Sequence, residues 1–196
     1  MGDIKSAREI AMEKLEKLEG ATDEERLGWK YVPEGEKLAA KYLKQGCDLP
    51  AELSKHEEKA RRYVIQGAGE ILIRNIDLPK SDLIRKNNRK AMDGLKAIKT
   101  DKVSVENVYS KIRRIFNHYA EQGEQQRKQA YETLKAEFES KVQQAIQQQL
   151  GSFAGVRIDV EKQPQFQEEW HRIQAQLDLQ YIKLLDEYKQ ELLAIP

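Results

Sequence analysis

Cysteine is almost absent from this chain, because Cys47 is the only one in 196 residues. A single cysteine excludes an intramolecular disulfide and a zinc site built from several cysteines. No run approaches the ~20 consecutive apolar residues of a membrane-spanning helix, and the first residues lack the apolar core of a signal peptide. The sequence therefore predicts a cytoplasmic protein in a reducing compartment, with no membrane partner.

The chain also lacks the motifs of the common enzyme classes. It contains no His-Glu-x-x-His pair and no phosphate-binding loop, and residues 67–69 lack the third glycine of a dinucleotide fingerprint. Glu168 and His171 share a helix face, but a di-iron site in a helix bundle needs two such Glu-x-x-His motifs, and the chain has one. We interpret His171 as a surface residue. We predict a protein that is not an enzyme, with no catalytic residue, no metal site and no cofactor.

Proline and glycine are scarce as well, with five and eleven residues respectively, which favours helices. Hydrophobic residues make up 39% of the chain and charged residues 34%, a polar composition that suits elongated helices. The predicted fold class is all-α. We expect an N-terminal helical region over residues 1–120 and a C-terminal helical hairpin over residues 121–196.

Stop and start signals divide the N-terminal region, after a first helix expected over residues 3–18. Thr22 and Glu25 form a capping box, which predicts a short helix ending near Gly28. A turn at residues 33–35 separates it from another helix, which ends at Gly46.

Asp48 is predicted to lie near the N-terminal cap of the next helix and Pro50 in its first turn. We expect this helix to continue to about Ile73. Residues 71–76 fit a strand equally well. Residues 77–79 break the chain again.

Two further helices complete the region. One is predicted over residues 81–98, and Ser104 is predicted to cap the next, which Gly123 then kinks or interrupts.

Two long apolar stripes mark the C-terminal hairpin. Successive apolar residues of the second stripe are about 3.7 residues apart on average, close to the 3.67 of an 11-residue repeat. We therefore expect the two helices of the hairpin to lie nearly straight or to form a slight right-handed supercoil. Such arms form a coiled-coil-like antiparallel pair. The interface residues expected from the stripes are Tyr131, Leu134, Phe138, Val142, Phe166, Trp170, Ile173, Leu177, Tyr181, Leu184 and Tyr188.

The connector between the arms changes period. Val156, Ile158 and Val160 alternate with charged residues, which is typical of a strand. One short strand at the hairpin tip could pair with residues 71–76, or with a second copy of the chain across a two-fold axis. The alternative is an ordered loop whose apolar residues cover the end of the hairpin.

Charge is distributed in blocks: the net charge is −3 over residues 1–54, +8 over 55–120 and −4 over 121–196. The basic block could bind phosphates, but the acidic ends of its own chain or of a second copy satisfy it equally well, and we favour that interpretation. The cations that would bind an acidic partner or nucleic acid are Lys55, Lys59, Arg62, Arg85, Lys86, Arg89, Lys90, Lys111 and Arg114.

Residues 1–14, MGDIKSAREIAMEK, resemble the N-termini of small uncharacterised bacterial helical proteins. This resemblance implies a bacterial cytosolic protein and assigns no function and no functional residue. Separately, the near-11-residue spacing of the arms looks like that of stalk helices in rotary ATPases.

Taken together, long apolar stripes without a catalytic constellation favour an interaction or scaffold protein. Our leading hypothesis is a non-enzymatic homodimer that assembles through the hairpin and binds an unknown protein partner. The alternative is a nucleic-acid accessory protein that uses the basic faces of residues 55–114.

Overall fold

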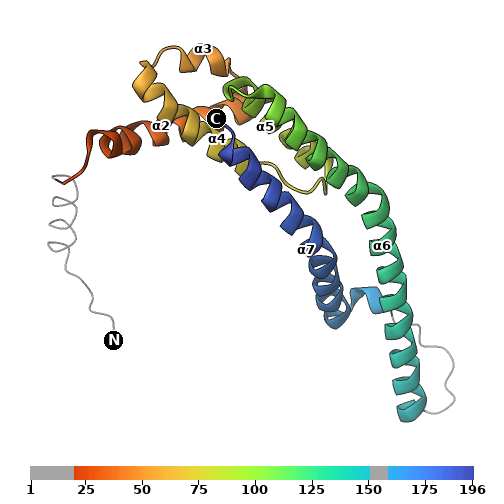
Figure 1. The fold of residues 1–196 in the computed structure, drawn as a ribbon. Helices are drawn as coiled ribbons and strands as arrows, with labels where there is room; N and C mark the ends of the chain where they lie inside the picture. Colours follow the sequence, from red (N-terminus) through yellow and green to blue (C-terminus); the bar gives the residue numbers. More distant parts are fainter. Residues whose placement is uncertain (1–19, 151–158) are drawn as a thin grey trace, which may run out of the picture. The chain divides into compact units, whose positions relative to one another are not determined.

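The computed structural model describes residues 20–150 and 159–196 (Figure 1), and the helix expected over residues 3–18 lies outside them. The described residues form helices and no strand, which confirms the all-α prediction. The elements are α2 (Asp23–Gln45), α3 (Leu49–Leu53), α4 (Glu58–Arg74), α5 (Asp82–Ile98), α6 (Lys102–Leu150), the 3-10 helix η1 (Val160–Lys162) and α7 (Pro164–Ala194).

The chain divides into two compact units. Of the described residues, those up to Ile76, with Arg85–Glu106 and Leu193–Pro196, form unit 1. Unit 2 consists of the described residues within Asp77–Ile84 and Asn107–Leu192. Helix α6 contributes to both units and continues through Gly123, so the interruption considered there is ruled out, whereas the kink stays a prediction. The division at residues 120 and 121 stays a prediction.

Helix α2 begins where the sequence predicts. The backbone N–H of Thr22 donates to Oε2 of Glu25 at 2.8 Å, and the N–H of Glu25 donates to Oγ1 of Thr22 at 3.3 Å. The helix ends at Gln45 and is capped by Gly46, whose φ of 77° suits glycine. The predicted stop near Gly28 and the turn at residues 33–35 are wrong, because α2 continues through both.

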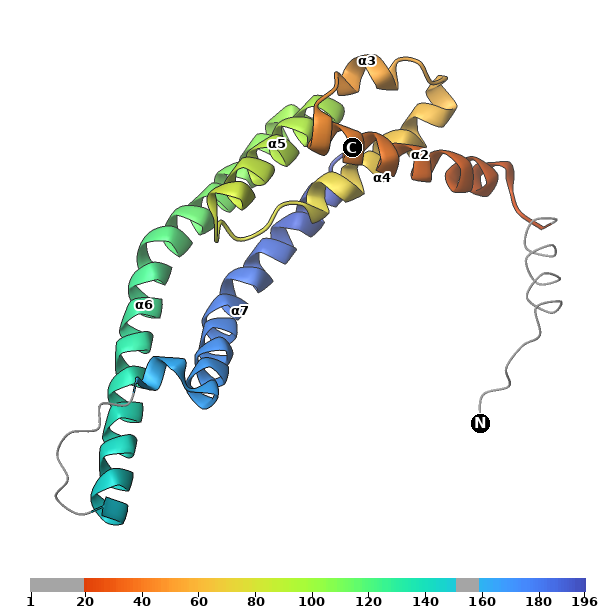
Figure 2. The ribbon, with the colours of Figure 1, turned by 180° about the vertical axis from the view of Figure 1, so that it is seen from behind.

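The crossing of α2 over α4 explains this continuity (Figure 2). A Cβ atom on Gly35 would collide with the Val64 carbonyl oxygen and lie 2.8 Å from the Ala68 nitrogen. On the other helix, a Cβ atom on Gly67 would collide with the Val32 carbonyl oxygen. Gly35 is therefore a contact point and not a turn residue, and packing offsets the hydrogen bond that α2 loses at Pro33.

The helix expected from Asp48 to Ile73 is interrupted. Asp48 does cap α3, accepting from the Ala51 N–H at 3.1 Å, but α3 ends at Leu53. Arg61 then donates to the carbonyls of Leu53 at 3.1 Å and His56 at 3.0 Å. This side chain satisfies carbonyl groups that a continuous helix would have paired internally.

Helix α4 extends to Arg74, which rules out a strand over residues 71–74, and the break at residues 77–79 is confirmed. In unit 1, α5 packs on α2 and α4. A Cβ atom on Gly94 of α5 would lie 2.7 Å from the Tyr42 ring on α2 and 3.2 Å from Leu72 on α4. Helix α6 is capped by Asp101, which accepts from the N–H of Ser104 at 3.0 Å, so the predicted cap at Ser104 is three residues late.

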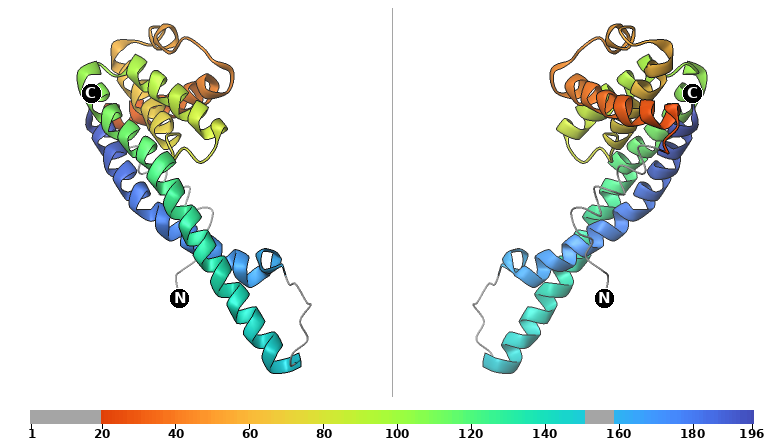
Figure 3. Two further views of the ribbon diagram at one scale, coloured as in Figure 1. Left: turned by 90° about the vertical axis from the view of Figure 1, so that its right-hand side faces the viewer. Right: turned by 90° about the vertical axis from the view of Figure 1, so that its left-hand side faces the viewer.

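In unit 2, α6 and α7 run side by side in opposite directions (Figure 3). Of the alternating connector, residues 156–158 lie outside the described residues, and Val160 begins η1. At this end the connector is therefore a helical turn and not the expected strand. The supercoil expected from the near-11-residue spacing stays a prediction.

Candidate interaction surface on the α6–α7 hairpin

Aromatic rings hold the two arms of unit 2 together. Phe166 is fully buried, and its ring meets those of Tyr131 and Phe138 edge-on with centroids 5.5 and 5.4 Å apart. Trp170 meets Tyr131 in the same way at 5.0 Å. Edge-to-face pairs add to the stability gained from burial. The structure thus brings these four predicted interface residues together, and the fifth, Leu134, is buried.

Further along α7, not all of the predicted interface residues are buried. Leu184 is 44% exposed, whereas Leu185 is 1% exposed, so the inward assignment of Leu184 is wrong. Tyr181 is buried and its ring meets Tyr119 at 5.1 Å. Four further predicted interface residues are partly buried, namely Val142, Ile173, Leu177 and Tyr188.

A buried ion cluster occupies this face. The Asp178 side chain is 8% exposed, and its Oδ2 lies 2.7 Å from Nζ of Lys80. Its Oδ1 lies 3.8 Å from Nη1 of Arg127, and neither of these two atoms has a hydrogen-bond partner in the described part of the chain. Burying a carboxylate is costly without cations close by, so Lys80 and Arg127 keep Asp178 in this position.

Tyrosines surround the cluster. The Arg127 guanidinium lies 4.2 Å from the centroid of the Tyr119 ring and donates to the Tyr119 carbonyl at 3.3 Å. Burial, together with the negative charge of Asp178, raises the pKa of Tyr119 to about 12. Nδ1 of His118 lies 3.0 Å from Oη of Tyr181.

Sequence reasoning missed the ion cluster. Asp178 precedes Tyr181 by three residues and Leu185 by seven, so it continues the buried helical spacing that the sequence contains. That spacing was a usable signal for an inward carboxylate. No sequence pattern marks Lys80, nearly a hundred residues away, as its partner.

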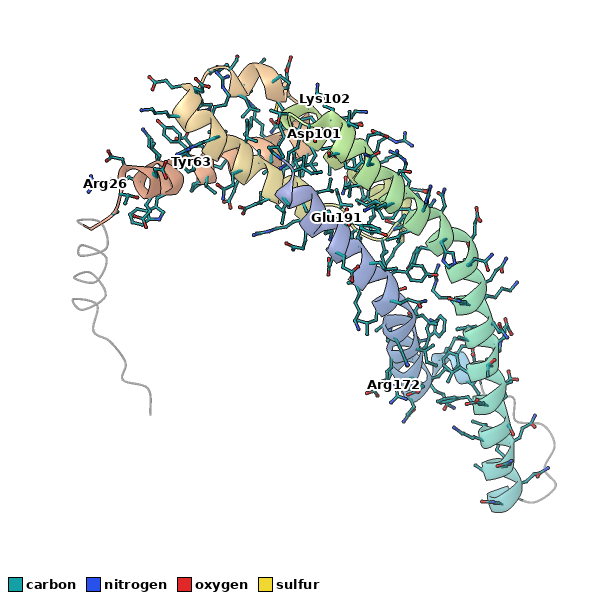
Figure 4. The ribbon with its side chains drawn as sticks, in the orientation of Figure 1. Arg26, Tyr63, Asp101, Lys102, Arg172 and Glu191 are labelled. Carbon is teal, nitrogen blue, oxygen red and sulfur yellow. The ribbon has the colours of Figure 1, made fainter. Side chains whose placement is uncertain are left out.

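Several of the predicted basic residues are paired within their own unit. Lys55 lies 2.8 Å from Glu52, Arg62 lies 2.8 Å from Glu24, and Lys111 lies 2.8 Å from Glu191. These three pairs are solvent-exposed and contribute little stability each. Figure 4 shows Tyr63, to whose hydroxyl Arg62 also donates, on α4.

The remaining cations differ in their surroundings. Lys90 donates to the Leu43 carbonyl at 2.8 Å, and Arg85 also has a partner. Within residues 20–150 and 159–196, no ion pair involves the exposed side chains of Lys59, Lys86, Arg89 and Arg114. Three of these cations lie in unit 1 and Arg114 lies in unit 2. Phosphate binding stays a hypothesis for each unit separately.

The metal hypothesis finds no support around Glu168 and His171. Both side chains are exposed on α7, and the described residues contain no group of three or more His, Cys, Asp or Glu side chains placed to hold a metal ion. No helix among the described residues has both the length and the hydropathy needed to cross a bilayer. Cytoplasmic location stays a prediction.

Exposed apolar side chains gather on α7. Leu179 is 49% exposed and Ile182 is 37% exposed, and three residues along a helix place two side chains on the same face. Isolated exposed leucines are common, but neighbouring ones on a long helix mark contact surfaces.

Comparison with known proteins gives a family and no function. No curated protein and no solved structure is significantly similar to this chain. A family model described as "Family of unknown function (DUF6657)" matches residues 50–194, which include α4 to α7. The expected resemblance to uncharacterised proteins is thus confirmed, although a bacterial origin stays a prediction. Because the match spans most of its length, the chain belongs to this family of unknown function.

Proposed function

We propose that this chain is a non-enzymatic interaction protein that self-associates through the outward face of α7. The observation that supports this proposal is the exposed pair of Leu179 and Ile182. The aromatic residues of the hairpin are already occupied by contacts within the chain. Self-association through the hairpin therefore has to use apolar side chains that the seam leaves exposed.

A two-fold dimer suits this face. In such a dimer each copy presents the same patch, so two residues per chain supply four apolar side chains at the interface. Burial of each leucine or isoleucine contributes about 1.5 to 3 kcal/mol if it becomes fully buried. Polar residues at the edges of a long helix can complete the remaining interface area.

Sedimentation velocity over a range of protein concentrations tests the proposal. We expect the wild-type chain to dimerise and the double variant Leu179→Glu/Ile182→Glu to sediment as a monomer with unchanged helix content. Leu83→Glu is the matched control, because Leu83 is 68% exposed on α5 and should tolerate the charge without loss of the dimer. A wild-type chain that remains monomeric at every concentration contradicts the proposal.

A second candidate function is nucleic-acid binding, supported by the exposed cations Lys59, Lys86, Arg89 and Arg114, which form no ion pairs in the described part of the chain. We propose testing it with a fluorescent oligonucleotide across a salt series, since phosphate contacts weaken steeply with salt. Lys86→Glu/Arg89→Glu should then abolish binding. Lys55→Glu, at a cation already paired with Glu52, is the control. Absence of binding at low salt contradicts this candidate.

A further inference from the structure

A groove runs between the two arms of unit 2. It consists of two adjoining cavities of about 490 and 520 Å³, which share Leu134, Glu137 and Glu169 in their walls. Ala130 on α6 and Ile173 on α7 add apolar surface to the second cavity. The lining of α6 extends from Gln126 to Lys141, which corresponds to roughly 22 Å of helix.

The groove lies on the side of the seam away from Tyr131, and Phe138 is the one seam ring that also lines its first cavity. On α6, Ala130, Thr133 and Glu137 follow one another at helical spacing and line the groove. Around the circumference of α6, Leu134 lies between these three residues and Tyr131, whose ring packs on Phe166. One side of the hairpin is thus closed by aromatic contacts, and the other has small and polar side chains above an apolar floor.

Unpaired carboxylates flank this floor. Each arm contributes one, Glu137 from α6 and Glu168 from α7, and no cation of the described chain forms an ion pair with either. Glu169 is paired with Arg172 at 2.8 Å, and Figure 4 labels Arg172 on α7. Lys141 lies 5.4 Å from the centroid of the Phe138 ring. The first cavity thus has three carboxylates and the two cations Lys141 and Arg172 in its wall, whereas the second has Glu137 and Glu169 and no cation. The lining is therefore acidic in balance, in a region whose net charge is −4 over residues 121–196.

We propose that this groove binds an amphipathic helix of a partner protein, about four turns long, whose apolar stripe is flanked by lysine or arginine. A groove with an apolar floor between two helices recognises the apolar face of a third helix, and its rim charges select the partner. A second copy of this chain is a poorer occupant. Docking of the same face would bring Glu137 and Glu168 of both copies into one interface, and like charges repel.

This inference goes beyond the proposed self-association, which uses Leu179 and Ile182. Neither residue lines the groove. Helix binding and dimerisation can therefore be lost separately, and an experiment on one does not decide the other.

Fluorescence anisotropy with the full chain and two designed peptides tests the proposal. Both peptides are 16-residue helices with the same leucine stripe; one carries lysine on its flanks and the other carries glutamate at the same positions. We expect the lysine peptide to bind and the glutamate peptide to bind at least tenfold more weakly. Glu137→Lys/Glu168→Lys should reverse this preference.

Two controls separate the groove from general electrostatics and from self-association. Glu132→Lys/Glu187→Lys makes the same charge change at exposed positions outside the groove and should alter affinity by less than about twofold. Ala130→Arg should fill the groove and abolish peptide binding, with sedimentation and helix content unchanged.

Three results would overturn the proposal. The first is equal affinity for the two peptides, or binding of neither to the folded chain. The second is an equal effect of Glu132→Lys/Glu187→Lys. The third is loss of the dimer with Ala130→Arg, because the groove would then be the interface between copies.

Discussion

The α2–α4 crossing in unit 1 and the α6–α7 hairpin in unit 2 both join two helices, but through different groups. At the crossing, Gly35 and Gly67 let backbone meet backbone. In the hairpin, rings and charged groups such as Phe166 and Asp178 fill the space between the arms. The crossing should therefore be damaged by adding atoms, and the hairpin by removing them.

The chain contains a separate reporter for each region. Trp29 lies on α2 in unit 1, and Trp170 lies on α7 in unit 2, and these are the only two tryptophans in the sequence. Trp29→Phe leaves Trp170 to report on unit 2, and Trp170→Phe leaves Trp29 to report on unit 1. Urea unfolding followed by tryptophan fluorescence can thus measure the two regions one at a time.

Phe166→Ala should have the largest effect. The ring is fully buried between Tyr131 and Phe138, so its removal leaves a cavity and should lower the free energy of unfolding of unit 2 by about 4 kcal/mol. Unfolding in the Trp29→Phe background measures this loss. Leu184→Ala, at a half-exposed position on α7 in the same unit, is a control that should cost far less. If the Trp29 transition shifts as much as the Trp170 transition, the two units do not unfold separately.

Gly67→Ala should have the next largest effect, and it adds an atom where Phe166→Ala removes a ring. The added Cβ atom would collide with the Val32 carbonyl and force α2 away from α4, at a cost of about 3 kcal/mol. Gly69→Ala is the control on the same helix, because its Cβ atom would lie 4.0 Å from Leu95. It should be neutral or stabilising through helix propensity. Equal effects of the two substitutions would show that the crossing is looser than described.

Asp178→Asn should destabilise unit 2 by about 2 kcal/mol, since it removes the negative charge facing Lys80 and Arg127. The loss is smaller than for a fully buried pair because Lys80 is half exposed and can be hydrated. Unfolding followed by Trp170 measures it. Asp186→Asn on the exposed surface of α7 is the control and should change stability by less than about 0.5 kcal/mol. No difference between the two variants would mean that the cluster contributes nothing to stability.

The last expected effect is a pH dependence that is seen only at alkaline pH. The pKa of Tyr119 is raised from 10.0 to about 12 in the folded chain, so folding favours the neutral phenol. This contribution is fully present below pH 10 and is lost as the pH rises toward 12. The difference in stability between wild type and Tyr119→Phe should therefore change over this interval, measured by urea unfolding. A constant difference would contradict the assigned burial and charge environment.

Local signals predicted much of the fold. The capping box at Thr22, the stop at Gly46, the cap at Asp48 and the break at residues 77–79 depend on neighbours within one turn. The aromatic seam was also accessible, because its rings recur at helical spacing.

The errors occurred where distant groups override local preference. Gly35 carries a turn signal, but its contact with Val64 keeps it in a helix. Arg61, eight residues further along the chain, donates to the Leu53 carbonyl at the point where α3 ends. The ion cluster around Asp178 depends on Lys80, and no local signal reports such a pair. Leu184 and Leu185 both fit a helical spacing from Tyr181, and the sequence does not show which of the two is buried.

The α2–α4 crossing has a practical consequence for anyone who shortens this chain. The family model matches residues 50–194, yet α2 ends at Gln45, outside that stretch. A fragment trimmed to the family limits would lose the helix that covers Val64 and Ala68 on α4 and would expose an apolar strip to water. Such a fragment should aggregate on expression, because the limits of the family match do not coincide with those of a unit that folds by itself.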